Sequence, residues 1–193
     1  IRQKYTSGKM SDAALSDLIR FSLLEHFGGT WIDATVLLTG KIPEYILESD
    51  FFAFRDTFGL IENPATISNW LLHSVPHNII IKEAKSYSVA IIGQDVINMA
   101  FAYWRNEEYV VDYLFTYMIL QIAYERNVNS CGWFPYANSD YCHQYLNVLD
   151  EPFSEKVLEH ITRLSSIHKL TYKLKEEVYE RKNTFYAHLM QGE

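Results

Sequence analysis

The sequence predicts a mixed α/β or α+β domain, because strand patterns dominate its first part and helix patterns follow. Apolar and polar residues alternate over residues 30–36, and this period of two is typical of a strand. From about residue 78 the apolar spacing becomes helical and the segments become longer. A chain of 193 residues also suits one hydrophobic core, so we expect a single domain over 1–193.

The first strong element is a helix that begins after Ser11, a suitable N-cap, and ends at Phe27. Gly28 or Gly29 supplies the left-handed residue that ends it. Its apolar side chains surround most of the circumference, so we expect burial on nearly every side. These side chains are Leu15, Leu18, Ile19, Phe21, Leu23, Leu24 and Phe27.

The strand over 30–36 follows at once. Its period of two directs Trp31, Asp33 and Thr35 to one face, and the apolar set to the core on the other face. Later segments are assigned in the same way. We predict further strands over 51–56, 66–73 and 165–173, helices over 42–48, 78–87, 94–105, 109–126 and 153–164, a loop over 131–143 and an exposed charged helix over 173–183.

Composition excludes several classes of protein. A net charge of −7 argues against nucleic acid as the main partner, because phosphate binding needs a basic face. Cys131 and Cys142 are too few for a disulfide scaffold and match no zinc spacing, which favours a reducing compartment. No apolar run approaches the roughly 20 residues that span a bilayer, and no secretory signal is visible. The chain opens at Ile1, so we expect the natural N-terminus to lie upstream.

Asp17 and Arg20 stand three residues apart on the first helix, so their side chains can touch. One interpretation is an ion pair on a solvated helix face, which contributes a few tenths of a kcal/mol. The other is a ligand site, because an arginine held by an aspartate can present donors to sugar hydroxyls or to a diphosphate. The residues alone leave both interpretations open.

Asp33 and Thr35 offer oxygen ligands, which Mg²⁺ and Mn²⁺ prefer. A lone aspartate at the end of a strand is also typical of a turn that it caps with its own side chain. His168 lies between strand-forming residues, with Lys169 and Lys173 nearby; an imidazole can join a carboxylate at a metal, and lysines can neutralise phosphate. A polar loop is the alternative. Asp112 is either an acid near an acceptor or an ordinary surface charge.

These residues closely resemble the central motif of the capsular polysaccharide synthesis proteins. That family is related to glycosyltransferases whose sugar-binding region contains a DXD motif, and to the glucosylating domains of large clostridial toxins. Further similar blocks are residues 67–74, the segment around Asp112 and residues 167–173. The shared pattern is Asp-x-x-Arg, Gly-Gly, an aromatic residue and Asp-x-Asp, which reads here Asp17, Arg20, Gly28, Gly29, Trp31, Asp33 and Thr35.

The resemblance implies a GT-A-like nucleotide-sugar transferase domain, with a Rossmann-like sheet, a helix-rich C-terminal half and an N-terminal part that this sequence lacks. It implies transfer of a sugar from a UDP- or GDP-sugar to a growing capsular or surface polysaccharide, including a lipid-linked acceptor. The related enzymes are hexosyltransferases that mostly retain the anomeric configuration. Such a protein is expected in the cytoplasm or at the inner face of the membrane.

The resemblance also implies roles for single residues. Asp17 and Arg20 would bind the donor sugar, and Asp33 would bind both the donor and a divalent cation, Mn²⁺ or Mg²⁺. The remaining roles are supporting ones. Trp31 would shape the donor pocket, Thr35 and Asn69 would contact the substrate, His168 would join Asp33 at the metal, Lys173 would hold the diphosphate, and Asp112 would lie on the acceptor side.

The sequence departs from the motif at Thr35, which replaces the second aspartate, as is usual for the capsule branch. A hydroxyl is a poorer metal ligand than a carboxylate, so the departure predicts weaker metal binding. It also keeps an alternative open, a non-catalytic glycan-binding or assembly module that retains the transferase fold. A metal-dependent phosphatase or nuclease is less favoured, because only one well-placed carboxylate is evident and two-metal sites need several.

Overall fold

The computed structural model describes residues 12–55, 67–94, 115–130, 135 and 137–191. The helix predicted over 94–105 and the candidate Asp112 lie outside these residues. The chain divides into two compact units, each built from two segments. The first unit is Ile1–Trp31 with Tyr45–Ala137, and the second is Ile32–Glu44 with Asn138–Glu193. The change from one unit to the other therefore falls inside the motif that the sequence singles out.

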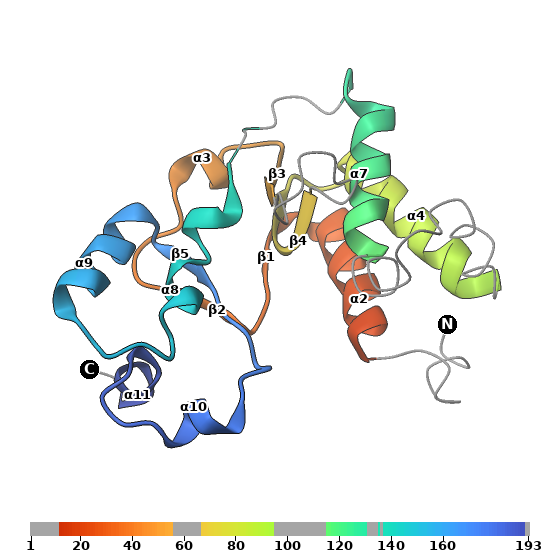
Figure 1. Ribbon diagram of the computed structural model, residues 1–193. Helices are drawn as coiled ribbons and strands as arrows, with labels where there is room; N and C mark the ends of the chain where they lie inside the picture. The colour runs from red at the N-terminus through yellow and green to blue at the C-terminus, as the bar shows by residue number, and fades with distance from the viewer. Residues whose placement is uncertain (1–11, 56–66, 95–114, 131–134, 136, 192–193) are drawn as a thin grey trace. The chain divides into compact units, whose positions relative to one another are not determined.

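The first unit combines a small sheet with helices that pack beside it (Figure 1). The sheet order is β1-β4-β3, and β3 pairs antiparallel with β4. Helix α2 contacts α4 and β4, while α7 contacts α4 and β4. The elements are α2 (Asp12–Phe27), β1 (Gly29–Ile32), α3 (Glu44–Leu47), β3 (Phe51–Arg55), β4 (Ile67–Ser74), α4 (Ile79–Gln94) and α7 (Phe115–Asn127).

The core of this unit forms where the helices meet one face of the sheet. Phe51 and Ala53 of β3 and Leu72 of β4 are fully buried there with residues of α2, α4 and α7. The other face of β3 is buried as well, because Phe54 stacks on Trp70 with ring centroids 4.8 Å apart. Strand β3 is thus apolar on both faces, which explains its continuous apolar sequence.

Helix α2 matches the predicted bounds, but the expectation of burial on nearly every side is wrong. Leu18, Phe21 and Leu24 are buried, whereas Ile19, Leu23 and Phe27, which stand four residues apart, are exposed to 44%, 43% and 68%. A helix that packs on neighbours along one face buries one stripe, whatever its overall hydrophobicity.

The helix ends as predicted, at two glycines in the left-handed region. Gly28 has a φ of 66° and Gly29 a φ of 92°, and the Gly28 N–H donates to the Leu24 carbonyl at 2.9 Å. A Cβ atom on Gly28 would lie 2.7 Å from Cδ of Pro76, so this glycine also permits a close approach of two backbone segments.

The strand predicted over 30–36 is interrupted. Strand β1 ends at Ile32, the Val36 N–H donates to the Asp33 carbonyl at 3.0 Å, and β2 (Val36–Leu38) begins after this turn. Aspartate favours the first position of such a turn, and this local preference overrides the alternating pattern. Asp33 and Thr35 therefore lie in a turn, rather than on one face of a strand with Trp31.

The second unit is built on a two-stranded ribbon. Strand β2 pairs antiparallel with β5 (Ile167–Lys169), with Leu37 opposite His168. Its core contains Tyr145, Leu149 and Phe185. The remaining elements are the 3₁₀ helix η2 (Ser139–Tyr141), α8 (Gln144–Asn147), α9 (Glu155–Leu164), α10 (Glu176–Glu180) and α11 (Phe185–Gln191).

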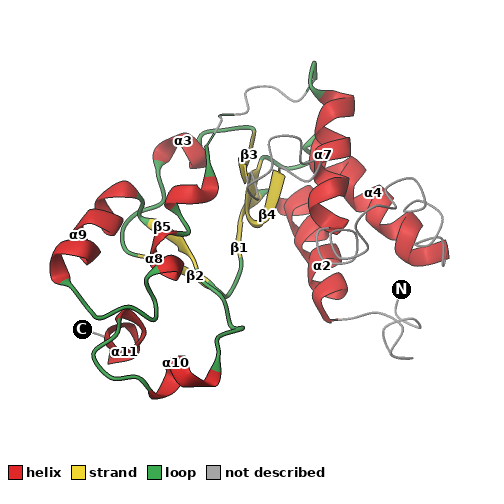
Figure 2. Cartoon of the chain, viewed as in Figure 1, coloured by secondary structure: helices red, strands yellow, loops and turns green. Residues whose placement is uncertain are grey.

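Several predictions on this unit are confirmed. Helix α9 lies within the predicted range 153–164, and β5 lies within 165–173. The charged segment forms the short helix α10. The sequence pattern does not predict α8 or α11, and η2 lies within the range 131–143 predicted as a loop. Helix is the main secondary structure of the described residues, and the sheets are small (Figure 2). The chain is thus mixed α/β, and a Rossmann-like GT-A sheet stays a prediction. None of the described helices has both the length and the apolar character that crossing a membrane requires.

Candidate functional site

Asp17 is the centre of a polar cluster in the first unit. Its Oδ1 atom lies 2.8 Å from Nη1 of Arg20 and accepts a hydrogen bond of 3.3 Å from the amide of Asn69. Its Oδ2 atom accepts a hydrogen bond from the hydroxyl of Thr116. These partners come from α2, β4 and α7, so three separate elements hold one carboxylate in place.

The burial of Asp17 and Arg20 bears on whether they form a solvated ion pair or part of a ligand site. The Arg20 side chain is 5% exposed and that of Asp17 is 22% exposed, so the pair does not lie on a solvated helix face. The indole of Trp31 lies 5.0 Å from the guanidinium carbon of Arg20 and covers it. The buried guanidinium is fixed by its neighbours, and the carboxylate reaches solvent only in part.

The turn after β1 forms a second polar cluster, in the second unit. Nζ of Lys169 lies 3.5 Å from Oδ2 of Asp33 and contacts the hydroxyl of Thr35. The lysine backbone is fixed, because Lys169 is opposite Val36 in the ribbon and the Leu170 N–H donates to the Thr35 carbonyl at 2.8 Å. The two motif oxygens thus face one ammonium group.

His168 lies on the other face of the same strand, because neighbouring side chains of a strand point in opposite directions. It is fully buried beside Tyr145, with ring centroids 5.5 Å apart, and its Nε2 atom lies 2.9 Å from the hydroxyl of Thr39. Burial lowers the pKa of the His168 imidazole to about 4. The structure does not bring His168 to the face of β5 that carries Lys169 and its partner Asp33.

The donor set around Asp33 does not fit a divalent cation. Mg²⁺ and Mn²⁺ need several oxygen ligands, and here a lysine ammonium contacts both the carboxylate and the hydroxyl of the motif. Over the described ranges, no group of three or more histidine, cysteine, aspartate or glutamate side chains is suitably placed for a metal ion. Lys173, the other candidate lysine, is exposed after β5, with Nζ 5.8 Å from the ring centroid of Tyr172.

The sequence does not indicate the contacts of two residues that complete the clusters, Thr116 and Lys169. Thr116 follows Asp17 by 99 residues, and no local pattern links them. The sequence indicates only that Lys169 is a basic residue near His168, whereas its partners in the structure are Asp33 and Thr35. The antiparallel pairing of β2 with β5 is what brings it there. A predicted pairing of residues 36–38 with 167–169 could have found it.

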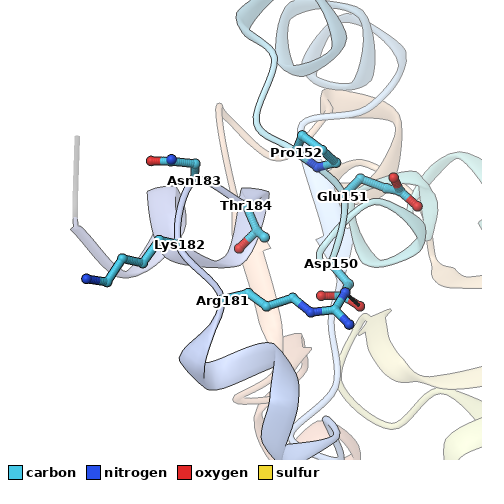
Figure 3. A pocket seen from close by; sticks show the side chains of 7 residues that line it. All are labelled: Asp150, Glu151, Pro152, Arg181, Lys182, Asn183 and Thr184. Atoms are coloured by element: carbon cyan, nitrogen blue, oxygen red, sulfur yellow. Dashed lines mark hydrogen bonds and ion pairs between the residues drawn. The ribbon is translucent and has the colours of Figure 1, made fainter.

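A separate polar pocket of about 480 Å³ lies in the second unit (Figure 3). Its side chains come from the segment before α9 and from the segment between α10 and α11, and Arg181 pairs with Asp150 at 2.6 Å. None of the residues predicted from the sequence lines it. The lining residues are Asp150, Glu151, Pro152, Arg181, Lys182, Asn183 and Thr184.

Searches of curated proteins and of solved structures give no significant match. The family model described as "Capsular polysaccharide synthesis protein" matches residues 1–189, nearly the whole sequence. Because this match extends well beyond the Asp-x-x-Arg and diglycine motif, it does not depend on that motif alone. The chain belongs to the capsular polysaccharide synthesis protein family.

Proposed function

We propose that this chain is a glycosyltransferase that moves a sugar from a nucleotide-sugar donor to a growing capsular or surface polysaccharide. Family membership supports a role in capsule synthesis. The observation that carries the assignment to sugar transfer is the buried cluster around Asp17. An ordinary ion pair on the surface does not need contacts with three separate elements. A ligand site does need a carboxylate in a fixed orientation, and the contacts from α2, β4 and α7 provide one.

The chemistry of the first cluster suits a sugar. A partly exposed carboxylate accepts hydrogen bonds from two neighbouring hydroxyl groups, and an aromatic ring beside it offers an apolar surface to the C–H face of the sugar. We therefore assign contact with the donor sugar to Asp17, orientation of its carboxylate to the buried Arg20, and shaping of the apolar side of the site to Trp31. Asn69 serves as a positioning residue, because its amide contacts the Asp17 carboxylate.

In the second unit, taken by itself, we assign binding of a diphosphate group to the cluster of Lys169, Asp33 and Thr35. In the transfer, the bond between the anomeric carbon and the diphosphate oxygen breaks, that carbon bonds to the acceptor oxygen, and the proton of the acceptor hydroxyl passes to the leaving diphosphate or to solvent. Negative charge develops on the leaving nucleoside diphosphate, so a fixed cation near it lowers the barrier. Lys169 is the cation that the structure places beside Asp33 and Thr35. Roles for Lys173 and Asp112 stay predictions.

Binding experiments with the full chain test this proposal. We would measure the affinities of UDP, UDP-glucose, GDP and GDP-mannose by titration calorimetry, and then measure release of nucleoside diphosphate in the presence of a capsular acceptor. At least one nucleotide sugar should bind more tightly than its own nucleoside diphosphate. The variant D17N should remove this difference and leave the affinity for the nucleoside diphosphate unchanged, because it alters the group assigned to the sugar and none of the residues assigned to the diphosphate.

A matched control is D150N, which changes an exposed aspartate of an ion pair in the second unit, in the separate pocket. It should leave both affinities unchanged. The proposal is wrong if no nucleotide sugar binds, or if the sugar adds nothing to the affinity of the wild-type chain. Binding of a glycan that is indifferent to nucleotides would instead favour the non-catalytic module.

A further inference from the structure

We infer that Lys169 supplies the positive charge that a divalent cation supplies at a metal-dependent diphosphate site, so that this chain binds a diphosphate without a metal. The inference rests on the proposed function for the class of ligand. Its own observation is the contact of one ammonium group with both oxygen-bearing residues of the motif, Asp33 and Thr35.

The ammonium contacts the same two side chains that the motif would offer to a metal. A metal at the motif would have the Asp33 carboxylate and the Thr35 hydroxyl as its protein ligands and would complete its shell with water and phosphate oxygens. Lys169 Nζ already lies 3.5 Å from Oδ2 of Asp33 and contacts Oγ1 of Thr35. A second cation between the same oxygens would be repelled by the ammonium, so the two are alternatives.

The fold holds this lysine in place before a ligand arrives. Its backbone N–H donates to the Cys142 carbonyl at 2.9 Å, and the ribbon register sets it opposite Val36, one residue after Thr35. Its side chain is only 20% exposed. The loss of side-chain freedom, which normally opposes binding by a long flexible lysine, has therefore largely occurred during folding.

The contacts also allow the charge to be used. At 3.5 Å the contact with Asp33 is a loose ion pair rather than a short hydrogen bond, so a small shift of the ammonium can bring it to a phosphate oxygen. Asp33 then orients the ammonium, and Thr35 offers a hydroxyl to the same phosphate. Together the three residues form a diphosphate site in which the lysine ammonium supplies the positive charge.

The test uses the full chain, inorganic pyrophosphate and Mn²⁺. Binding of Mn²⁺ is measured from the loss of the electron paramagnetic resonance signal of the free ion, and binding of pyrophosphate by titration calorimetry with EDTA present or absent. We expect no Mn²⁺ binding that depends on Asp33, and a pyrophosphate affinity that EDTA leaves unchanged. K169M should weaken pyrophosphate binding about tenfold or more, as expected for loss of one hydrogen bond to a charged group.

Two further variants keep this result interpretable. K169R retains the charge and should restore part of the affinity, which separates loss of the cation from a loss of folding. K156M removes an exposed lysine of α9 in the same unit and should leave the affinity for pyrophosphate unchanged. Equal weakening by K156M and K169M would mean that only net charge matters, and would overturn the inference.

Other outcomes separate this inference from the proposed function. Mn²⁺ binding to the wild-type chain that D33N abolishes, or pyrophosphate binding that EDTA abolishes, overturns the metal-free site and leaves sugar transfer intact. If pyrophosphate fails to bind the wild-type chain at all, the inference is also wrong. If pyrophosphate binding depends on Lys169 but no nucleotide sugar binds, the site stands and the proposed function fails.

Discussion

Removal of the Asp17 carboxylate tests whether the cluster in the first unit is as fixed as its contacts indicate. The variant D17A leaves the Arg20 guanidinium in place, with its side chain 5% exposed and its ion-pair partner gone. It also removes the acceptor of the hydrogen bonds from Asn69 and Thr116. The arginine then has to be rehydrated or to stay charged without its carboxylate.

The expected cost follows from the burial of the two side chains. Removing one partner of a buried ion pair costs about 3–5 kcal/mol, because an uncompensated charge stays buried. Asp17 is 22% exposed, so water can replace part of the lost interaction. We therefore expect D17A to lower the free energy of unfolding by about 3 kcal/mol, the lower end of that range.

Tryptophan fluorescence during urea unfolding is a suitable assay. All four tryptophans of the sequence belong to segments of the first unit, and the second unit has none, so the signal reports on the unit that carries the cluster. The control is E83A, which removes the partner of Arg126 at 3.8 Å in the same unit, where the arginine side chain is 66% exposed. An exposed pair of this kind contributes at most about 1 kcal/mol.

A double variant completes the experiment. R20M replaces the guanidinium by an apolar side chain of similar length, so D17A/R20M should be more stable than D17A alone. The reasoning is refuted if D17A costs no more than E83A, or if the double variant is as unstable as the sum of the two single variants. Either result would mean that Arg20 finds water or another anion without its aspartate.

Two further predictions concern the second unit and the diglycine turn. Burial lowers the pKa of His168 from 6.5 to about 4, so the unfolded chain takes up a proton more readily than the folded chain as the pH falls through this range. The stability contributed by the neutral ring is fully present above pH 6.5 and is lost as the pH falls toward 4, by up to about 3 kcal/mol. Urea unfolding followed by near-ultraviolet circular dichroism of tyrosine should show this loss of stability. The variant H168Q should lack this pH dependence. At the turn, G29A should lower the free energy of unfolding by about 1–2 kcal/mol, because residue 29 has a positive φ but a Cβ there meets nothing within 4 Å. G28A should lower it clearly more, because a Cβ at residue 28 would also lie 2.7 Å from Cδ of Pro76. Equal thermal shifts of the two variants would contradict the role of close approach at Gly28.

The parts of the fold that depend on local sequence could be predicted. Helix α2 and its diglycine end follow from apolar spacing and from the need for a positive φ, and both lie within one stretch of chain. The break at Asp33 could not be predicted from alternation alone, because a turn preference competed with a strand pattern and both fitted the residues.

The candidate site was predicted only as far as its residues are close in sequence. The Asp17–Arg20 pair follows from helical spacing, but the contacts with Asn69 and Thr116 depend on how β4 and α7 pack against α2. In the same way, the pairing of β2 with β5 buries His168 on one face of β5 and directs Lys169 toward Asp33 and Thr35 on the other. The two strands are more than a hundred residues apart in the sequence, so no local pattern indicates their register.

The pairing of β2 with β5 has a consequence for the order in which the chain can fold during synthesis. The segments of the first unit are complete once Ala137 has left the ribosome, whereas β2 has no partner until residues 167–169 have followed. Closing so long a loop is slow compared with forming local contacts. A nascent chain therefore carries the Asp33 turn unsupported from the time the turn emerges until residues 167–169 have followed, and truncation before Ile167 would leave that turn permanently without the lysine that faces it.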